Sequence, residues 1–117
     1  MKLEDIKKDT QLINSIDWDM TPEEAVTLYL EWGNNWSHGK YVIRSKNDFS
    51  HYFVINTWGE KPQIYLIRRN SEDVQELAQF DLPEHLVNDF YDSVGCHKGV
   101  YAIEGSIKDW LKNQLDT

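Results

Sequence analysis

The sequence predicts an α+β domain: a four-stranded antiparallel meander flanked by two N-terminal and two C-terminal helices. Helical spacing of apolar residues at both ends of the chain is the first observation behind this prediction. The second is an apolar period of two in the middle, and the third is that turn-forming segments of about four residues separate the strand-like runs. The 117 residues contain no linker-like tract, so we expect one domain spanning residues 1–117.

Two helices are expected before the strands. The first covers residues 3–13, where apolar residues recur three or four apart. The second begins after Thr21, the expected N-cap, with Pro22 in the first helical position and Glu24 completing a capping box. Gly33 then supplies the left-handed residue at which many helices end.

The strands begin at Lys40. Four strand-like runs follow, at residues 40–44, 49–58, 62–69 and 74–80. Loops this short favour antiparallel hairpins over parallel crossovers. The last run also has apolar residues at helical spacing, so a helical turn at residues 74–80 is an alternative prediction to a strand.

The run at residues 49–58 is apolar on both faces. Phe53 and Ile55 would point to one face, and Tyr52 and Val54 to the other. This pattern predicts helices on one face of the sheet and a different cover, such as a partner subunit, on the other.

Two helices are expected after the strands. Asp81 is the expected cap of the first, with Glu84 as its capping-box partner, and Gly95 ends it. Residues 99–103 then form an extended link or a short strand. Ser106 is the expected cap of the last helix, whose apolar side chains face inward.

Charge and composition limit the classes of function. The net charge is −8, which opposes general binding to nucleic acid, although residues 40–69 alone carry six Lys or Arg against two acidic residues. The single cysteine cannot form an intramolecular disulfide, and the N-terminus has no apolar signal-peptide core. No apolar run approaches the roughly 20 residues that span a bilayer. We therefore expect a soluble cytoplasmic protein that does not enter membranes.

Known catalytic and cofactor motifs are absent from the sequence. The glycines form no phosphate-binding loop, and no C-x-x-C, H-E-x-x-H or G-x-S-x-G motif occurs, so we expect no cofactor. Four histidines and one cysteine are candidate metal ligands: His38, His51, His85, His97 and Cys96. Their spacings match no zinc template, so we expect no metal site.

A cysteine-dependent enzyme is one alternative function. Cys96 and His97 lie in a glycine-flanked loop, where a thiol with a lowered pKa could act as a nucleophile beside a histidine base. A lone thiol is more often inert and packed behind a helix end. We therefore keep Cys96 and His97 as the weaker hypothesis.

Aromatic and basic residues suggest a binding surface instead. Five tryptophans and six tyrosines exceed what a modest core requires, and both residue types are enriched at interfaces. The predicted binding residues are Trp36, His38, Trp58, Arg44, Arg68 and Arg69. The favoured function is a non-catalytic module that docks on a protein partner or on a second copy of itself. A single-stranded nucleic-acid module using the basic, aromatic sheet is the remaining alternative.

Overall fold

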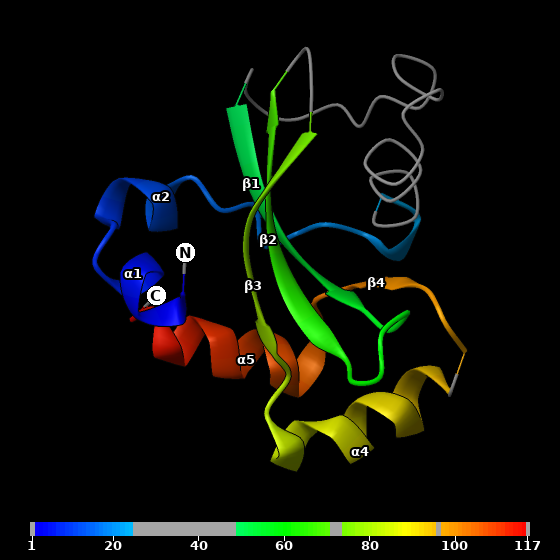
Figure 1. The fold of residues 1–117 in the computed structure, drawn as a ribbon. Helices are drawn as coiled ribbons and strands as arrows, with labels where there is room; N and C mark the ends of the chain where they lie inside the picture. The colour runs from blue at the N-terminus through cyan, green and yellow to red at the C-terminus, as the bar shows by residue number, and fades with distance from the viewer. Residues whose placement is uncertain (1, 25–48, 71–73, 96, 117) are drawn as a thin grey trace.

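The computed structural model describes residues 2–24, 49–70, 74–95 and 97–116 (Figure 1). Its named elements are, in chain order, α1 (Leu3–Lys7), α2 (Thr10–Asn14), β1 (Phe49–Asn56), β2 (Gln63–Asn70), β3 (Val74–Asp81), α4 (Glu84–Val94), β4 (Val100–Ala102) and α5 (Gly105–Gln114). A further helix begins at Pro22 and continues through the last residue described before the gap. This arrangement confirms the predicted α+β class.

The four strands form one antiparallel sheet in the order β3-β2-β1-β4. Consecutive hairpins build β1, β2 and β3, whereas β4 returns late in the chain to pair with the other edge of β1. The fourth described strand therefore comes from residues 99–103, where a short strand was one of two expectations. The predicted strand at residues 40–44 lies outside the described residues. The alternative of a helical turn at residues 74–80 is wrong, because these residues pair with β2.

Both faces of the sheet are apolar, as predicted. Phe53 and Ile55 of β1 belong to the larger core cluster, which also contains buried side chains of α1, α2, α4 and α5. Tyr52 and Val54 belong to a second buried cluster on the opposite face, together with Met20. The alternation of a β-strand produces this division, since successive side chains point to opposite faces.

The short helices and aromatic rings close the larger cluster. In Figure 1, α1 lies beside the end of α5, and Ile6 and Leu115 share this cluster. Phe53 packs against Trp18 with ring centroids 5.7 Å apart and against Phe80 at 6.4 Å. These contacts join the N-terminal segment to the sheet.

The expected first helix is divided in two. Asp9 interrupts it between α1 and α2, and its Oδ1 accepts the Leu12 N–H at 3.1 Å as the N-cap of α2. Aspartate often bonds the local backbone in this way, which starts a new helix in place of continuing the old one.

The predicted capping box at Thr21 is confirmed. Thr21 Oγ1 accepts the Glu24 N–H at 3.2 Å, and Glu24 Oε1 accepts the Thr21 N–H at 3.4 Å.

Two predicted helix caps are wrong. Asp81 ends β3 opposite Gln63, whose Nε2 donates to Asp81 Oδ1 at 3.1 Å, so sheet pairing uses the side chain expected to cap α4. Ser106 lies inside α5, which already begins at Gly105. Gly95 ends α4 as predicted, with φ of 78°.

Candidate functional site

The turn between β1 and β2 presents the clearest candidate for a binding surface. Trp58 in this turn is 57% exposed, and among the described residues it is the large hydrophobic side chain that stands in solvent. Its N–H donates to Asn56 Oδ1 at 2.9 Å, which fixes the backbone at the start of the turn. The aromatic side chain is therefore held out from the sheet on a defined backbone.

Thr57 attaches this turn to the loop before β4. Its side chain is only 1% exposed, and Oγ1 accepts the Gly99 N–H at 2.8 Å. The same hydroxyl lies 3.2 Å from the carbonyl oxygens of His97 and Gly99 and can donate its proton to one of them. Lys98 Nζ also donates to the Gly59 carbonyl at 3.2 Å. These bonds restrain the backbone on both sides of Trp58.

A cavity of about 400 Å³ lies beside the same turn, between residues 60–62 and the start of α4. Leu82, Val87 and Tyr91 contribute its apolar lining. Its charged lining consists of Glu60, Asp81, Glu84 and Lys61. We call Trp58 together with this cavity the hairpin-end surface. Its described charged groups carry a formal sum of −2, from three carboxylates and one ammonium.

A second cavity, of about 430 Å³, lies between α2 and the opposite end of the sheet. We call it the His51 cavity. Its described lining is Asp9, Gln11, Leu12, Ser15, His51, Arg68 and Leu77. His51 is 5% exposed, and its Nδ1 lies 2.6 Å from Ser15 Oγ.

The Ser15 hydroxyl makes two hydrogen-bonding contacts, one with the Leu12 carbonyl and one with His51. The Ser15 hydroxyl donates to the Leu12 carbonyl at 2.8 Å, and a hydroxyl has one proton to donate. Ser15 Oγ can therefore accept from His51 Nδ1–H while its own proton is directed to Leu12. This contact holds the imidazole ring of His51 against the end of α2.

The environment of His51 favours its neutral form. Burial lowers the pKa of His51 below its ordinary value of 6.5, and the positive charge of Arg68 lowers this pKa further. Asp9 acts in the opposite direction but is the weakest of the three influences. The imidazole is therefore mainly uncharged at pH 7.

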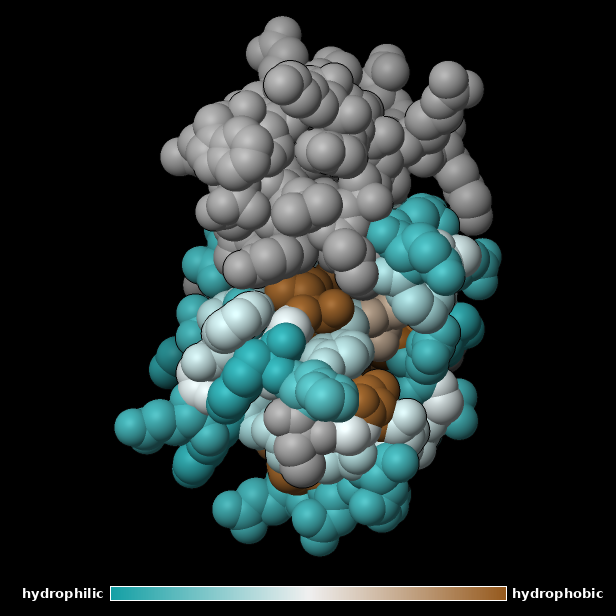
Figure 2. Space-filling model, turned by 90° about the vertical axis from the view of Figure 1, so that its right-hand side faces the viewer, coloured by the Kyte–Doolittle hydropathy of each residue, from teal (hydrophilic) through white to brown (hydrophobic). Residues whose placement is uncertain are grey.

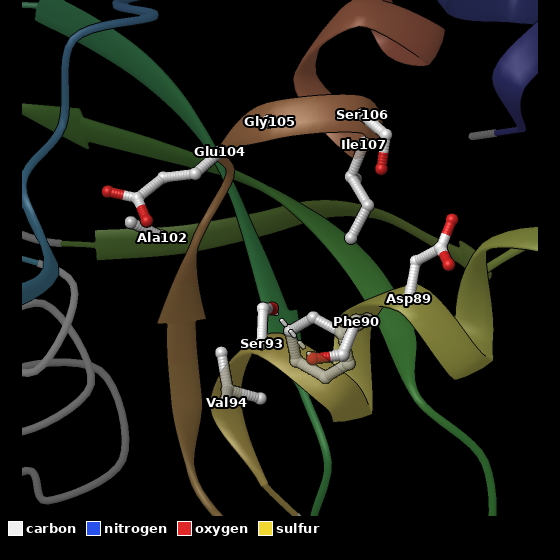
Figure 3. A pocket seen from close by; sticks show the side chains of 9 residues that line it. All are labelled: Asp89, Phe90, Ser93, Val94, Ala102, Glu104, Gly105, Ser106 and Ile107. Atoms are coloured by element: carbon white, nitrogen blue, oxygen red, sulfur yellow. Dashed lines mark hydrogen bonds between the residues drawn. The ribbon is translucent and has the colours of Figure 1, made fainter.

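A third cavity, of about 370 Å³, lies where α4 faces the start of α5 (Figure 3). Its described lining includes the carboxylates of Asp89 and Glu104 but no cationic side chain. The Ser93 hydroxyl donates to the Phe90 carbonyl at 2.8 Å. In the coloured part of the face shown in Figure 2, hydrophobic residues reach the surface in small patches among hydrophilic ones.

Several predicted site residues lie outside the described part of the chain: Trp36, His38, Arg44 and Cys96. Arg69 lies in β2 opposite Ser50. Trp58 and Arg68 are well separated, because Arg68 pairs with His51, seven residues before Trp58 along the chain. The five steps of extended strand from His51 to Asn56 alone span roughly 17 Å. The structure therefore does not bring these two predicted binding residues together.

The remaining histidines form no metal-binding group in the described ranges. His85 and His97 are exposed, and the His97 carbonyl accepts the Tyr101 hydroxyl at 2.7 Å. Within these ranges, no three His, Cys, Asp or Glu side chains are placed to hold a metal ion together.

Sequence reasoning missed the grouping of Ser15, His51 and Arg68. It depends on the β1–β2 register, which places His51 opposite Arg68, and on a parallel bridge between Ile16 and His51. The Asp17 N–H donates to the His51 carbonyl at 2.8 Å beside this bridge. The only available signal was a polar side chain at an inward-facing position of a strand.

Comparison with known proteins returned no match from family models, curated proteins or solved structures. In the described ranges, every helix is too short or too polar to cross a bilayer.

Proposed function

We propose that this protein is a non-catalytic interaction module that docks on a protein partner through the hairpin-end surface, with Trp58 as the anchor. The single observation that carries this proposal is a 57% exposed tryptophan on a turn whose backbone is tied down on both sides. Tryptophan is among the residues that most often dominate interface energetics.

The restrained turn supports this role for an energetic reason. Binding costs free energy when loops and side chains must be ordered, and a backbone already held by Thr57 and Lys98 avoids part of that cost. An exposed tryptophan on such a backbone keeps most of its apolar area available for burial by a partner.

The charge of the surface indicates the kind of partner. Three carboxylates and one ammonium line the cavity next to the turn that carries Trp58, and the whole protein carries a net charge of −8. A basic patch on the partner would be attracted to this surface, whereas the phosphate backbone of a nucleic acid would be repelled. The proposed partner is therefore a protein that presents a basic surface with an apolar pocket for Trp58.

Site-specific photocrosslinking tests the proposal. A benzophenone amino acid replaces Trp58 in one protein and Asn113, an exposed residue of α5, in a control protein. Both are irradiated in cytosolic extract, and cross-linked proteins are identified by mass spectrometry. We expect a defined protein cross-linked from position 58 but not from position 113.

The identified protein is then purified and its affinity measured directly. We expect Trp58→Ala to weaken binding at least tenfold, the effect of a typical tryptophan hot spot, and about 0.5 M NaCl to weaken it as well. Equal binding by wild type and Trp58→Ala would refute the anchor role. Cross-linking to a second copy alone would replace the proposed partner with self-association.

A further inference from the structure

The His51 cavity contains a group of polar side chains that the hairpin-end surface does not use. It lies at the far end of the sheet from Trp58, and its described lining combines a guanidinium, a carboxylate, an imidazole, an amide and a hydroxyl with two leucines. We propose that this cavity is a second binding site, for a small organic carboxylate with a short aliphatic chain. This proposal goes beyond docking on a protein partner and does not depend on it.

The polar end of the cavity is arranged by the sheet. Antiparallel register places His51 of β1, Arg68 of β2 and Gln75 of β3 in one row across three strands. Arg68 Nη2 donates to Gln75 Oε1 at 2.6 Å, which orients the guanidinium. A planar guanidinium matches a carboxylate better than any other cationic side chain. The row therefore supplies the positive group that a carboxylate requires.

The apolar end comes from two different layers. Leu12 of α2 is 7% exposed and Leu77 of β3 is half-buried, and both line the cavity. A cavity of about 430 Å³ falls in the range of small-molecule sites, which combine apolar walls with a few polar groups. An aliphatic chain of a few carbons can contact the leucines while its carboxylate lies near Arg68.

The two charged groups that the structure describes in the cavity differ in burial, and the more buried one is the cation. Among the described residues of its lining, Arg68 from β2 and Asp9 from the cap of α2 are the charged groups, and β3 contributes uncharged Leu77. Asp9 is exposed, whereas Arg68 is half-buried, so solvent screens the carboxylate more than the guanidinium. The positive field of Arg68 is the stronger of the two at His51 and lowers its pKa. A bound anion would counteract this effect and raise the pKa of His51.

Imidazole NMR of the whole protein tests the site through this property. The carbon-bound protons of His51 are followed during pH titrations with sodium butyrate, with its neutral analogue butyramide, or with inorganic phosphate. We expect butyrate to raise the His51 pKa and to saturate with a Kd of about 1 mM, a moderate affinity for so small a ligand. Butyramide and phosphate should leave the titration unchanged.

Matched variants check the assignment to Arg68. Arg68→Gln should abolish the butyrate effect, whereas Lys61→Gln removes the same charge at the hairpin-end surface and should leave it intact. An equal effect of butyramide, an effect of phosphate alone, or no effect of butyrate would each overturn the proposal. If Arg68→Gln fails to fold, the comparison of butyrate with butyramide on the wild-type protein still decides. Trp58→Ala should not alter butyrate binding, which separates this site from the docking surface.

Discussion

Replacing Thr57 with valine removes one buried hydroxyl without changing the shape of the side chain. The Gly99 N–H then loses an acceptor at 2.8 Å, and the carbonyls of His97 and Gly99 lose a donor at 3.2 Å. A buried hydrogen bond contributes about 1 kcal/mol, and a donor left without a partner costs about 1–3 kcal/mol. The Gly99 carbonyl keeps its bond from the Thr57 N–H at 3.0 Å, so we expect a total loss of about 2 kcal/mol.

Urea denaturation followed by circular dichroism measures this loss. Thermal unfolding checks the same loss. An unfolding entropy of about 2.1 cal/mol/K per residue gives about 0.25 kcal/mol/K for 117 residues, so a loss of about 2 kcal/mol should lower the Tm by about 8 °C. The control Thr57→Ser keeps the hydroxyl but deletes a methyl group, and should lose only about 1 kcal/mol. If Thr57→Val is as stable as wild type within about 0.5 kcal/mol, these bonds do not hold the turn, and Trp58 does not stand on a restrained backbone.

Three further predictions concern stability. Phe53→Ala removes the ring that packs against Trp18 and Phe80, and should lower the free energy of unfolding by about 3–5 kcal/mol in urea denaturation. Trp58→Ala removes an exposed ring and should lower it by less than about 0.5 kcal/mol. Similar losses for both variants would contradict the buried position of Phe53 and the exposed position of Trp58. Gly95→Ala forces a Cβ onto φ of 78° and should cost about 1–2 kcal/mol, whereas Gly59→Ala, measured in parallel, should be nearly neutral. The pKa of His51 is lower in the folded protein than its ordinary value of 6.5, so the unfolded chain takes up this proton more readily. The neutral imidazole therefore contributes fully to stability above pH 6.5, and this contribution declines as the pH falls toward the folded-state pKa. Urea midpoints at pH 7.5 and 5.5 should therefore differ more for wild type than for His51→Gln, and an equal difference would refute the lowered pKa.

The α+β class and the strand runs of the described sheet follow from local sequence patterns. Alternation in residues 49–58 predicted which β1 side chains enter each core cluster, because the period of a strand fixes its faces. The Thr21 capping box and the stop at Gly95 were also predictable, since both depend on residues within four positions. The predicted caps at Asp81 and Ser106 were wrong. Asp81 pairs with β2 as the last residue of β3, and α5 begins at Gly105, one residue before Ser106.

The positions of the candidate sites were decided by contacts between distant segments. The pairing of β4 with β1 brings Gly99 to Thr57, 42 residues earlier, and so restrains the turn that carries Trp58. Register places His51 opposite Arg68, and the parallel bridge at Ile16 brings Ser15 to the same cavity. Propensity, capping and side-chain period act over a few residues, so the sequence determined which elements form and which faces are apolar. Packing of those faces against one another then selected the partners of each polar side chain, a choice that no local pattern contains.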